Sequence, residues 1–377
     1  MSWYASGRLD GPELTGGRLS IDMNALAANY AYLAAFAEPA ESGVTIKADA
    51  YGLGIAECAP VFWASGARSF FVALASEAVA LRAILPKANI YVLHGANAAN
   101  AAFLRDQKIA PVLGSPDMIS LWREFGAGAP CALHVDTGMN RLGLTLNEAR
   151  TLANDGLGNL NAVLLMTHFA CADEPDHPKN TSQIDSFNAA KALFPQLKTS
   201  LQNSAGAFLG EAARSDVARL GIALYGGEAV NNAANPMRPV VTAEAQVMMV
   251  REAKAGETVS YGATQVLTRE TRIAVCSVGY ADGYHRAISG TGVALRQTGR
   301  PAGYGFIAGY QVPILGRVTM DQTMFDVTDV PDVKASDFIE LFGPNISLDN
   351  AARAAGTIGY ELLTSLGRRY NRVYVGT

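Results

Sequence analysis

The sequence predicts an α/β fold, in which an N-terminal (β/α)8 TIM-like barrel is followed by a mostly β C-terminal domain. Apolar runs of strand length alternate with helical patterns over the first ~220 residues, and about eight such β/α units are what this barrel requires. The texture changes at residues 231–239, where Asn, Ala and Pro cluster. After them, short β-like segments are separated by Gly and Pro, which is typical of a β domain.

The first element is an extended segment, residues 18–22, which leads into a helix capped near Asp22 with Leu26, Tyr30 and Leu33 at helical spacing. Eight further runs are predicted as buried strands: 44–47, 70–74, 90–94, 110–113, 132–135, 163–168, 198–202 and 217–224. Helical patterns between them cover 77–85, 98–107, 116–125, 147–154 and 183–194. A doubly wound sheet is the alternative, because an element count from one sequence is easily wrong by one or two.

The remainder of the chain predicts the second domain. Its β segments are 241–250, 272–277, 293–295, 312–315 and 323–327, and helical pattern returns at 350–355 and 360–366. We therefore place one domain at residues 18–238 and another at 239–377, with residues 1–17 as a candidate addition to the second.

Composition indicates a globular enzyme and excludes several other classes. Of the 377 residues, 49% are hydrophobic and 17% are charged, which excludes a disordered chain. The net charge of −4 offers no basic surface for nucleic acid. No stretch approaches the ~18 apolar residues of a membrane span, and the first residues lack an apolar signal segment. The four cysteines are far apart and lack metal or CxxC spacing, so we expect a cytoplasmic protein with reduced thiols.

Lys47 ends a β-branched run within the segment VTIKADAYGLG, residues 44–54. The C-terminal ends of barrel strands carry the chemistry of this fold, and a desolvated lysine there can lose its proton and form a Schiff base with an aldehyde cofactor. An isolated lysine at a strand end is more often structural. The whole segment, however, resembles the cofactor-lysine segment of the alanine racemases, with Leu53 where that family usually has histidine.

Further segments resemble the same family, in the same order along the chain. They are HVDTGMNRLG (134–143), MTHFA (166–170), QNSAG (202–206), ARLGI (218–222), VSYG (259–262), VGYADG (278–283), GRVTMDQ (316–322) and TIGYE (357–361). With the lysine segment, the resemblance covers nearly the whole chain. It implies a homodimeric enzyme that uses pyridoxal 5'-phosphate (PLP) and interconverts L- and D-alanine for peptidoglycan supply.

The resemblance also assigns roles to individual residues. Lys47 and Tyr280 would be the two catalytic bases, and Arg141 and the Met320 main chain would contact the substrate carboxylate. The residues that would hold PLP are Lys47, Tyr51, His168, Asn203, Ser204, Arg219, Gly221, Ile222 and Tyr360. The loops after the last two strands of a barrel often bind phosphate, and several of these residues stand there.

Arg219 would face the nitrogen of the cofactor ring. Many PLP enzymes place a carboxylate there, which keeps the nitrogen protonated and the ring a strong electron sink. An arginine cannot hand over its proton and leaves that nitrogen uncharged. The weaker sink suits a proton exchange and discourages transamination or elimination. The alternative for Arg219 is an ion pair within the barrel.

Inversion at a carbon requires two bases, since one group must remove a proton from one face and another must deliver a proton to the opposite face. Tyr280 has a reference pKa near ~10 and must be made more acidic, and Lys47 must be desolvated, before both can act near neutral pH. Arg141 and Arg219 are the available sources of positive charge. The two bases lie in different domains, and the resemblance implies that Tyr280 of one chain faces Lys47 of the other.

One position departs from the family pattern. His134 stands where the family often has a carboxylated lysine that positions the substrate arginine. Either the His134 imidazole steers Arg141, or another group does.

Two alternatives to an alanine racemase remain. One keeps PLP and the fold but acts on serine or on a broader range of amino acids, which depends on pocket size. The other is a non-catalytic PLP-binding protein, although such carriers resemble the barrel alone and lack the segments of Tyr280 and Met320. We expect alanine and a second copy of the chain as partners, and neither nucleic acid nor membrane.

Overall fold

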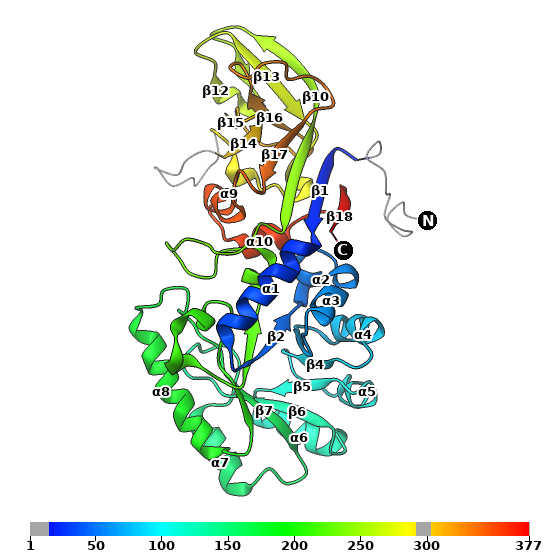
Figure 1. The fold of residues 1–377 in the computed structure, drawn as a ribbon, viewed down its shortest axis with the longest axis vertical. Coiled ribbons are helices and arrows are strands. Elements are labelled where there is room, and N and C mark those ends of the chain that lie inside the picture. The colour runs from blue at the N-terminus through cyan, green and yellow to red at the C-terminus, as the bar shows by residue number, and fades with distance from the viewer. Residues whose placement is uncertain (1–14, 292–302, 377) are drawn as a thin grey trace. The chain divides into compact units, whose positions relative to one another are not determined.

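The computed structural model describes residues 15–291 and 303–376, which form two compact units (Figure 1). The barrel unit comprises residues 26–237, and the β unit comprises residues 238–376 with the described part of residues 1–25. None of the helices in these described ranges has the length and apolar composition of a membrane span.

The barrel unit is built on eight parallel strands, as predicted. They are β2 (Glu41–Thr45), β3 (Ser69–Val72), β4 (Asn89–Val92), β5 (Ala110–Leu113), β6 (Pro130–His134), β7 (Asn161–Met166), β8 (Lys198–Ser200) and β9 (Val217–Leu220). They pair in the order β8-β7-β6-β5-β4-β3-β2-β9. Hydrogen bonds from Arg219 N to Gln202 O (2.8 Å) and from Ser200 Oγ to Val217 O (2.7 Å) join β9 to β8 and close the barrel.

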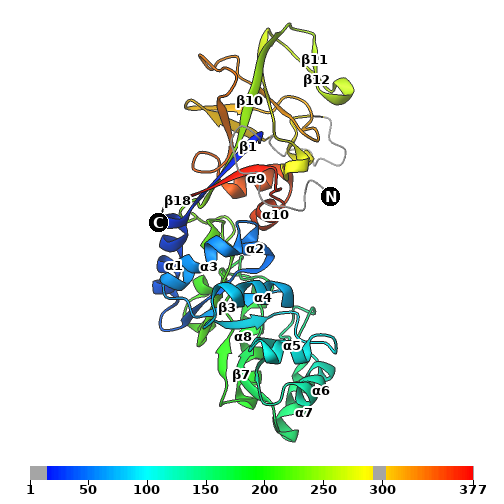
Figure 2. The ribbon, with the colours of Figure 1, turned by 90° about the vertical axis from the view of Figure 1, so that its right-hand side faces the viewer.

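Helices lie outside these strands (Figures 1 and 2). They are α1 (Met23–Ala37), α3 (Ile55–Ala64), α4 (Ala75–Ile84), α5 (Ala101–Asp106), α6 (Pro116–Phe125), α7 (Leu146–Asp155) and α8 (Pro178–Leu193). Asp22 caps α1 as predicted, because its Oδ1 accepts a hydrogen bond from Ala25 N at 2.9 Å. Helix α3 was not predicted, since Gly54 precedes it and Pro60 lies inside it.

Apolar side chains from the strands form the barrel core. The cluster comprises Phe71, Val112, Ala132, Leu164, Met166 and Val217. Because these side chains fill the centre of the barrel, the polar side chains of the site lie at the ends of the strands. Most predicted strands overrun the observed ends, because apolar residues continue into the loops. Residues 222–224, for example, belong to the 3-10 turn Ile222–Tyr225.

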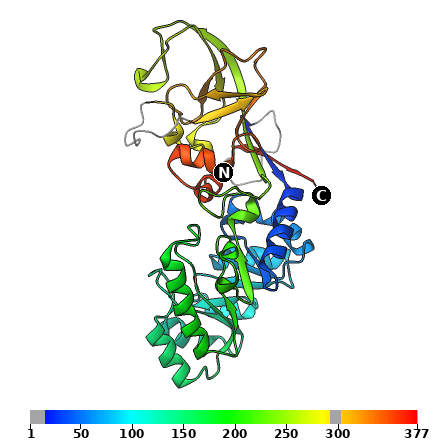
Figure 3. The ribbon, with the colours of Figure 1, turned by 60° about the vertical axis from the view of Figure 1, so that its left-hand side comes forward.

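The β unit is a second eight-stranded sheet, which confirms the mostly β character of the C-terminal third. Its strands are β1 (Gly17–Asp22), β10 (Val241–Ala253), β13 (Thr271–Cys276), β14 (Tyr304–Ile307), β15 (Tyr310–Pro313), β16 (Thr323–Asp326), β17 (Phe338–Phe342) and β18 (Tyr370–Val375). β10, the long yellow-green strand in Figure 3, pairs with β1, β13 and β17. The ladder of β11 (Thr258–Val259) and β12 (Gln265–Val266) and helices α9 (Leu348–Ala355) and α10 (Gly359–Thr364) complete this unit.

Strand β1 belongs to the β unit, where it pairs antiparallel with β10 and parallel with β18. The predicted boundary at residue 18 instead places this segment with the barrel. Residues 1–17 were the candidate addition to the second domain. Gly17 is the first residue of β1, whereas residues 1–14 lie outside the described residues. The predicted strand 293–295 also lies outside them. The predicted limits of the two domains, at residues 18–238 and 239–377, stay predictions.

Candidate functional site

The C-terminal ends of the barrel strands gather most of the residues singled out in the sequence. Lys47 follows β2, Arg141 follows β6, and His168 follows β7. The others of this unit follow β8 or lie in and after β9: Asn203, Ser204, Arg219, Gly221 and Ile222. Tyr280, Met320 and Tyr360 lie in the β unit.

Lys47 opens a turn with an unusual backbone. Ala48, Asp49, Ala50 and Tyr51 have φ values between +52° and +55°, which make a turn of left-handed helix. This conformation costs L-residues roughly 1–2 kcal/mol each. Such strain persists only where the surrounding structure holds it in place, often at functional sites.

Glu77 holds the strained turn. Its Oε1 accepts a hydrogen bond from Ala48 N at 2.6 Å, and its Oε2 accepts from Ala73 N at 2.8 Å and from Leu74 N at 3.0 Å. The carboxylate therefore ties the start of the Lys47 turn to the end of β3. Sequence reasoning missed Glu77, because Leu74 stands where a capping pattern would have Ser or Thr.

The environment of Lys47 favours its neutral amine. Burial is the largest cause that lowers its pKa, and the positive charge of Arg141 lowers it further, against an opposing effect of Glu77. A neutral amine is required both to attack an aldehyde and to accept a proton. The shift thus agrees with the desolvation expected of a cofactor lysine.

Arg219 is buried, and hydrogen bonds fix its guanidinium. Nη1 donates to Ser200 O (2.8 Å) and Ser200 Oγ (2.6 Å), while Nη2 donates to Thr167 O (2.5 Å) and lies 3.2 Å from His168 Nδ1. Because a guanidinium only donates, Nδ1 is the acceptor and a neutral His168 carries its proton on Nε2. Burial lowers the pKa of Arg219 to about 9, so it stays charged at neutral pH. Burial and Arg219 lower the pKa of His168 well below its usual value.

The loop that carries Arg141 is shaped by the Asp136 carboxylate. Asp136 Oδ1 accepts hydrogen bonds from Gly138 N and Met139 N, and Oδ2 accepts from Asn140 N, each at 2.8 Å. Arg141 itself is exposed, and within the described part of the chain its side chain makes no hydrogen bond or ion pair. Its guanidinium donors are therefore available for an external carboxylate.

His134, at the end of β6, is buried and uncharged at neutral pH. Burial, followed by the charge of Arg219, lowers its pKa to about 4; Arg141 adds to this effect and Asp136 opposes it. Among the described residues no hydrogen bond joins the His134 side chain to Arg141. Arg141 is thus positioned in this structure by its loop, which the hydrogen bonds of Asp136 hold in shape.

Two hydroxyl groups converge on the open face of Gly221. Gly221 N donates to Ser204 Oγ at 2.7 Å, which leaves the Ser204 hydroxyl hydrogen to donate elsewhere. A Cβ atom on Gly221 would lie 2.7 Å from Tyr51 Oη and 3.8 Å from Ser204 Oγ. The Tyr51 ring stacks on Tyr225 with centroids 4.6 Å apart. This cradle, which a side chain at Gly221 would fill, fits the phosphate of PLP.

Asn203 and Ile222 flank this cradle. Asn203 Oδ1 accepts a hydrogen bond from Gly206 N at 2.7 Å and so shapes the turn that presents Ser204. Ile222 is buried at the start of its 3-10 turn.

Gln183 joins the loops after β6 and β7, and sequence reasoning missed it. From α8, its Nε2 donates to Thr137 Oγ1 (3.1 Å) and His168 O (2.9 Å), and its Oε1 accepts from Ala170 N (2.8 Å). Thr137 Oγ1 also lies 2.8 Å from Thr167 Oγ1. A glutamine at a core position of the helical pattern 183, 187, 190 was the available signal.

In the β unit, the residues with predicted roles are accessible. The side chains of Tyr280, Met320 and Tyr360 are 42%, 54% and 39% exposed. Tyr280 lies in the turn Tyr280–Asp282 after β13, and Tyr280 N donates to Thr319 O at 3.0 Å. The segment of Tyr280 and the segment of Met320 therefore lie side by side.

Comparison with known proteins identifies both halves of the chain. The alanine racemase N-terminal domain model matches residues 21–229, and the alanine racemase C-terminal domain model matches residues 240–374. The biosynthetic alanine racemase of Agrobacterium fabrum is 50% identical over 365 residues, which cover 95% of this chain and 93% of that protein. The catabolic alanine racemase of the same organism is 39% identical over 368 residues, covering 95% and 92%.

Solved structures agree. The alanine racemase of Bartonella henselae, described with covalently bound pyridoxal phosphate, superposes with a TM-score of 0.88 at 34% identity, covering 96% of this chain and 99% of that chain. The biosynthetic alanine racemase of Pseudomonas aeruginosa has a TM-score of 0.87 at 32% identity, covering 96% and 100%. The family resemblance of the sequence is confirmed: the chain belongs to the alanine racemase family.

Proposed function

We propose that this chain is a PLP-dependent alanine racemase that interconverts L- and D-alanine. The observation that supports this most is the group of charges at the barrel strand ends. Lys47 has a lowered pKa, Arg219 is held by strand-end acceptors, and His168 and His134 are uncharged. Together they provide an amine that loses its proton more readily and a fixed positive charge, which suit an anionic cofactor and a carbanionic transition state.

Lys47 would hold the cofactor, and the Gly221 cradle would receive its phosphate. Ser204 and Tyr51 offer hydroxyl donors there, with Asn203 and Ile222 shaping the cradle and Tyr360 as a further contact from the resemblance. His168 would lie against the pyridine ring. When bound, PLP withdraws electrons from the amino-acid Cα and so acidifies its proton.

Arg219 would limit the reaction to proton exchange. Its Nη1 and Nη2 groups donate to Ser200 and Thr167, which fixes the guanidinium, and it remains charged at neutral pH. Because an arginine does not give up its proton, it would not protonate the ring nitrogen. Its Nη2 also orients His168.

Lys47 and Tyr280 would exchange the protons at opposite faces of the substrate Cα. Lys47 Nζ is the base whose pKa the barrel lowers. The Tyr280 Oη would be the second. Arg141 would grip the substrate carboxylate with its exposed guanidinium, and Met320 would contact that carboxylate through its main chain.

Alanine is the substrate that the family implies, while serine or a broader range is the alternative that pocket size decides. A biosynthetic role, supplying D-alanine for peptidoglycan, is favoured by the greater identity to the biosynthetic than to the catabolic enzyme of one organism. We propose the cytoplasm as location, since all four cysteines are free thiols, as in a reducing compartment.

We further propose a homodimer in which the β unit of one chain completes the barrel site of the other. The β unit carries a hollow of ≈ 1030 Å³ whose lining includes Met248, Met249 and Tyr261, and all three side chains are about half or more exposed. Adaptable methionines and an aromatic residue on a concave surface are typical of an interface.

The direct test is D-alanine formation from L-alanine by the purified protein, with L-serine assayed in parallel. Lys47→Ala should lose the visible absorbance of the bound cofactor and reduce racemisation in both directions by several orders of magnitude. Borohydride should abolish that absorbance in the wild type only. Wild-type turnover of serine at the alanine rate would favour the broader specificity. A Lys47→Ala protein that keeps both absorbance and activity would contradict the assignment.

A further inference from the structure

Arg369 lies between α10 and β18 and joins two carboxylates of the β unit. Nε and Nη2 donate to Asp282 Oδ1 and Oδ2 at 2.6 and 2.7 Å, and Nη1 donates to Asp321 Oδ1 at 2.8 Å. The Asp282 side chain is only 5% exposed, whereas that of Asp321 is 59% exposed. These bonds raise the pKa of Arg369. We call these three residues the Arg369 clamp.

One arm of the Arg369 clamp reaches the turn of Tyr280. Asp282 Oδ2 also accepts a hydrogen bond from Gly279 N at 2.9 Å, so the carboxylate fixes the residue immediately before Tyr280. Asp282 O accepts from Gly367 N at 2.9 Å, which ties the same turn to the segment before Arg369. A buried carboxylate with these partners defines the backbone of the Tyr280 turn.

The other arm reaches the segment of Met320. Asp321 follows Met320 directly, and Met320 O accepts a hydrogen bond from Ala281 N at 3.0 Å. Together with the bond from Tyr280 N to Thr319 O, this joins the two segments main chain to main chain. Arg369 adds a charged link across the same junction.

Two glycines show how closely these segments are packed. A Cβ atom on Gly279 would lie 2.3 Å from Thr319 O, and one on Gly283 would lie 2.0 Å from Ser365 O. Gly283 also has φ +89°, which disfavours other residues. At such distances one backbone cannot shift without displacing its neighbour.

We propose that Arg369 is a positioning residue that fixes Tyr280 and Met320 relative to each other. The inference rests on the proposed function, in which Tyr280 moves a proton and the Met320 main chain meets the substrate carboxylate. A planar guanidinium can bond to both carboxylates at once, whereas a lysine ammonium has no fixed fork. Loss of Arg369 should therefore loosen proton transfer and substrate grip together.

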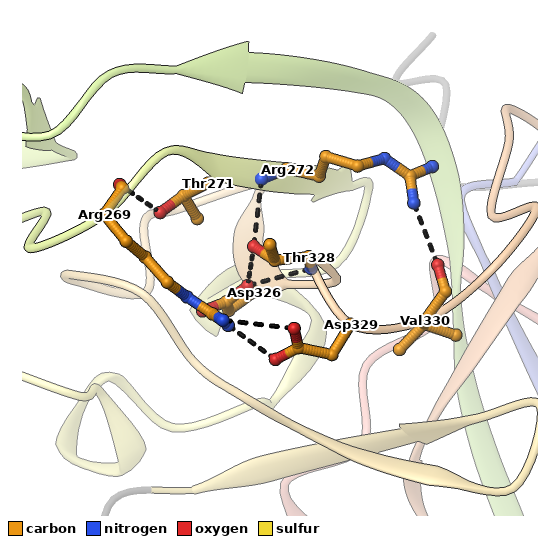
Figure 4. Close-up of polar contacts among 7 residues, drawn as sticks. All are labelled: Arg269, Thr271, Arg272, Asp326, Thr328, Asp329 and Val330. Atoms are coloured by element: carbon orange, nitrogen blue, oxygen red, sulfur yellow. Dashed lines mark hydrogen bonds and ion pairs between the residues drawn. The ribbon is translucent and has the colours of Figure 1, made fainter.

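The chain provides a matched control in Arg269 (Figure 4). Its guanidinium binds Asp329 with two bonds of 3.0 and 2.6 Å and lies 3.5 Å from Asp326, so it too joins two carboxylates of the β unit. Asp326 belongs to β16 and also accepts from Thr328 N at 2.9 Å. Among the described residues, the bonds and ion pairs of the Arg269 side chain reach neither the Tyr280 turn nor Met320, so Arg269→Met should leave activity unchanged.

The test compares Arg369→Met, Arg369→Lys, Asp321→Ala and the control Arg269→Met as PLP-loaded enzymes. We expect Arg369→Met to lower kcat on the order of tenfold or more and to raise KM for alanine, because small misplacements of reacting groups are costly. Hydrogen–deuterium exchange should rise in peptides spanning 279–283 and 319–322. Arg369→Lys should recover part of kcat, and Arg269→Met should match the wild type in all readouts.

The outcomes separate this inference from the proposed function. A wild type without racemase activity would contradict the proposed function itself. An active wild type with Arg369→Met kinetics and exchange equal to those of Arg269→Met would overturn the positioning role alone. If Arg369→Met fails to fold because Asp282 is left unpaired, Asp321→Ala decides. That variant removes the acceptor of the exposed arm only, and unchanged exchange at 319–322 with unchanged KM would overturn the proposal.

Discussion

At the residue scale, the chemistry depends on which groups are charged. Arg219 stays cationic because its proton acceptors surround it, and His168 and His134 are neutral because burial and that cation oppose a second positive charge. The sequence could place Lys47 and Arg219 at the strand ends of the barrel, since each lies in a distinctive segment, while their roles stay predictions. It could not predict Glu77 or Gln183, whose partners are brought together only by folding.

Arg219→Glu is the sharpest single-residue change. A carboxylate would keep the ring nitrogen protonated and strengthen the electron sink. We expect slower racemisation, a new long-wavelength absorbance band with alanine, and the appearance of pyruvate from transamination. Arg219→Lys keeps the charge, so its racemisation should slow less, and its long-wavelength band and pyruvate formation should be weaker. An unchanged spectrum and product profile in Arg219→Glu would count decisively against this role.

His134 provides a test of substrate positioning. If its imidazole steers Arg141, His134→Ala should raise KM for alanine, because a mobile guanidinium loses a grip made in ground and transition states alike. Wild-type kinetics would show instead that the loop held by Asp136 is sufficient, and Asp136→Asn should then raise KM.

The stability of the His134→Ala variant should depend on pH differently from that of the wild type. The folded pKa of His134 is about 4, below the usual histidine value of 6.5, so the unfolded chain binds more protons between these values. Its contribution to stability is therefore present above pH ~6.5 and is lost as pH falls towards ~4. By ~1.4 kcal/mol per pKa unit, the loss is on the order of 3 kcal/mol. Urea unfolding of wild type and His134→Ala across this range should show a shallower decline in the variant; equal slopes would exclude the effect.

At the element scale, the left-handed turn after Lys47 explains how Tyr51 reaches the cradle at Gly221. Sequence propensity could not reveal this turn, since an Ala-Asp-Ala-Tyr run has no glycine to indicate positive φ. Strands β17 and β18 were likewise missed. β17 is buried through most of its length and shows no alternation, and β18 pairs with β1 more than 340 residues away.

Gly221→Ala tests the cradle. Its Cβ would lie 2.7 Å from Tyr51 Oη, so the hydroxyl must move and PLP should bind about tenfold more weakly, measured by absorbance titration. Tyr51→Phe removes the obstructing atom. The double variant Gly221→Ala/Tyr51→Phe should then bind PLP only slightly more weakly than Tyr51→Phe alone. If the two substitutions weaken PLP binding additively, steric conflict with Tyr51 is not the cause of the weaker binding of Gly221→Ala.

At the scale of the whole molecule, the barrel and the β domain follow from periodicity, because eight β/α units and a change of texture are visible along the chain. The pairing of β1 with β10 and β18 is not, since it joins strands hundreds of residues apart. Assembly of two chains is a further level. The two proposed bases belong to different units and would act on opposite faces of one cofactor, an arrangement that a partner chain could complete.

The central claim is that Lys47 of one chain and Tyr280 of its partner form one site. Inactive Lys47→Ala and inactive Tyr280→Phe proteins are mixed in equal amounts, subunit exchange is verified, and D-alanine formation is measured. About half of the reassorted dimers are heterodimers, and each keeps one site with both bases, so about a quarter of wild-type activity should return. Mixed dimers with no activity above either parent would contradict the claim, because each chain would then supply its own tyrosine or Tyr280 would not be the second base.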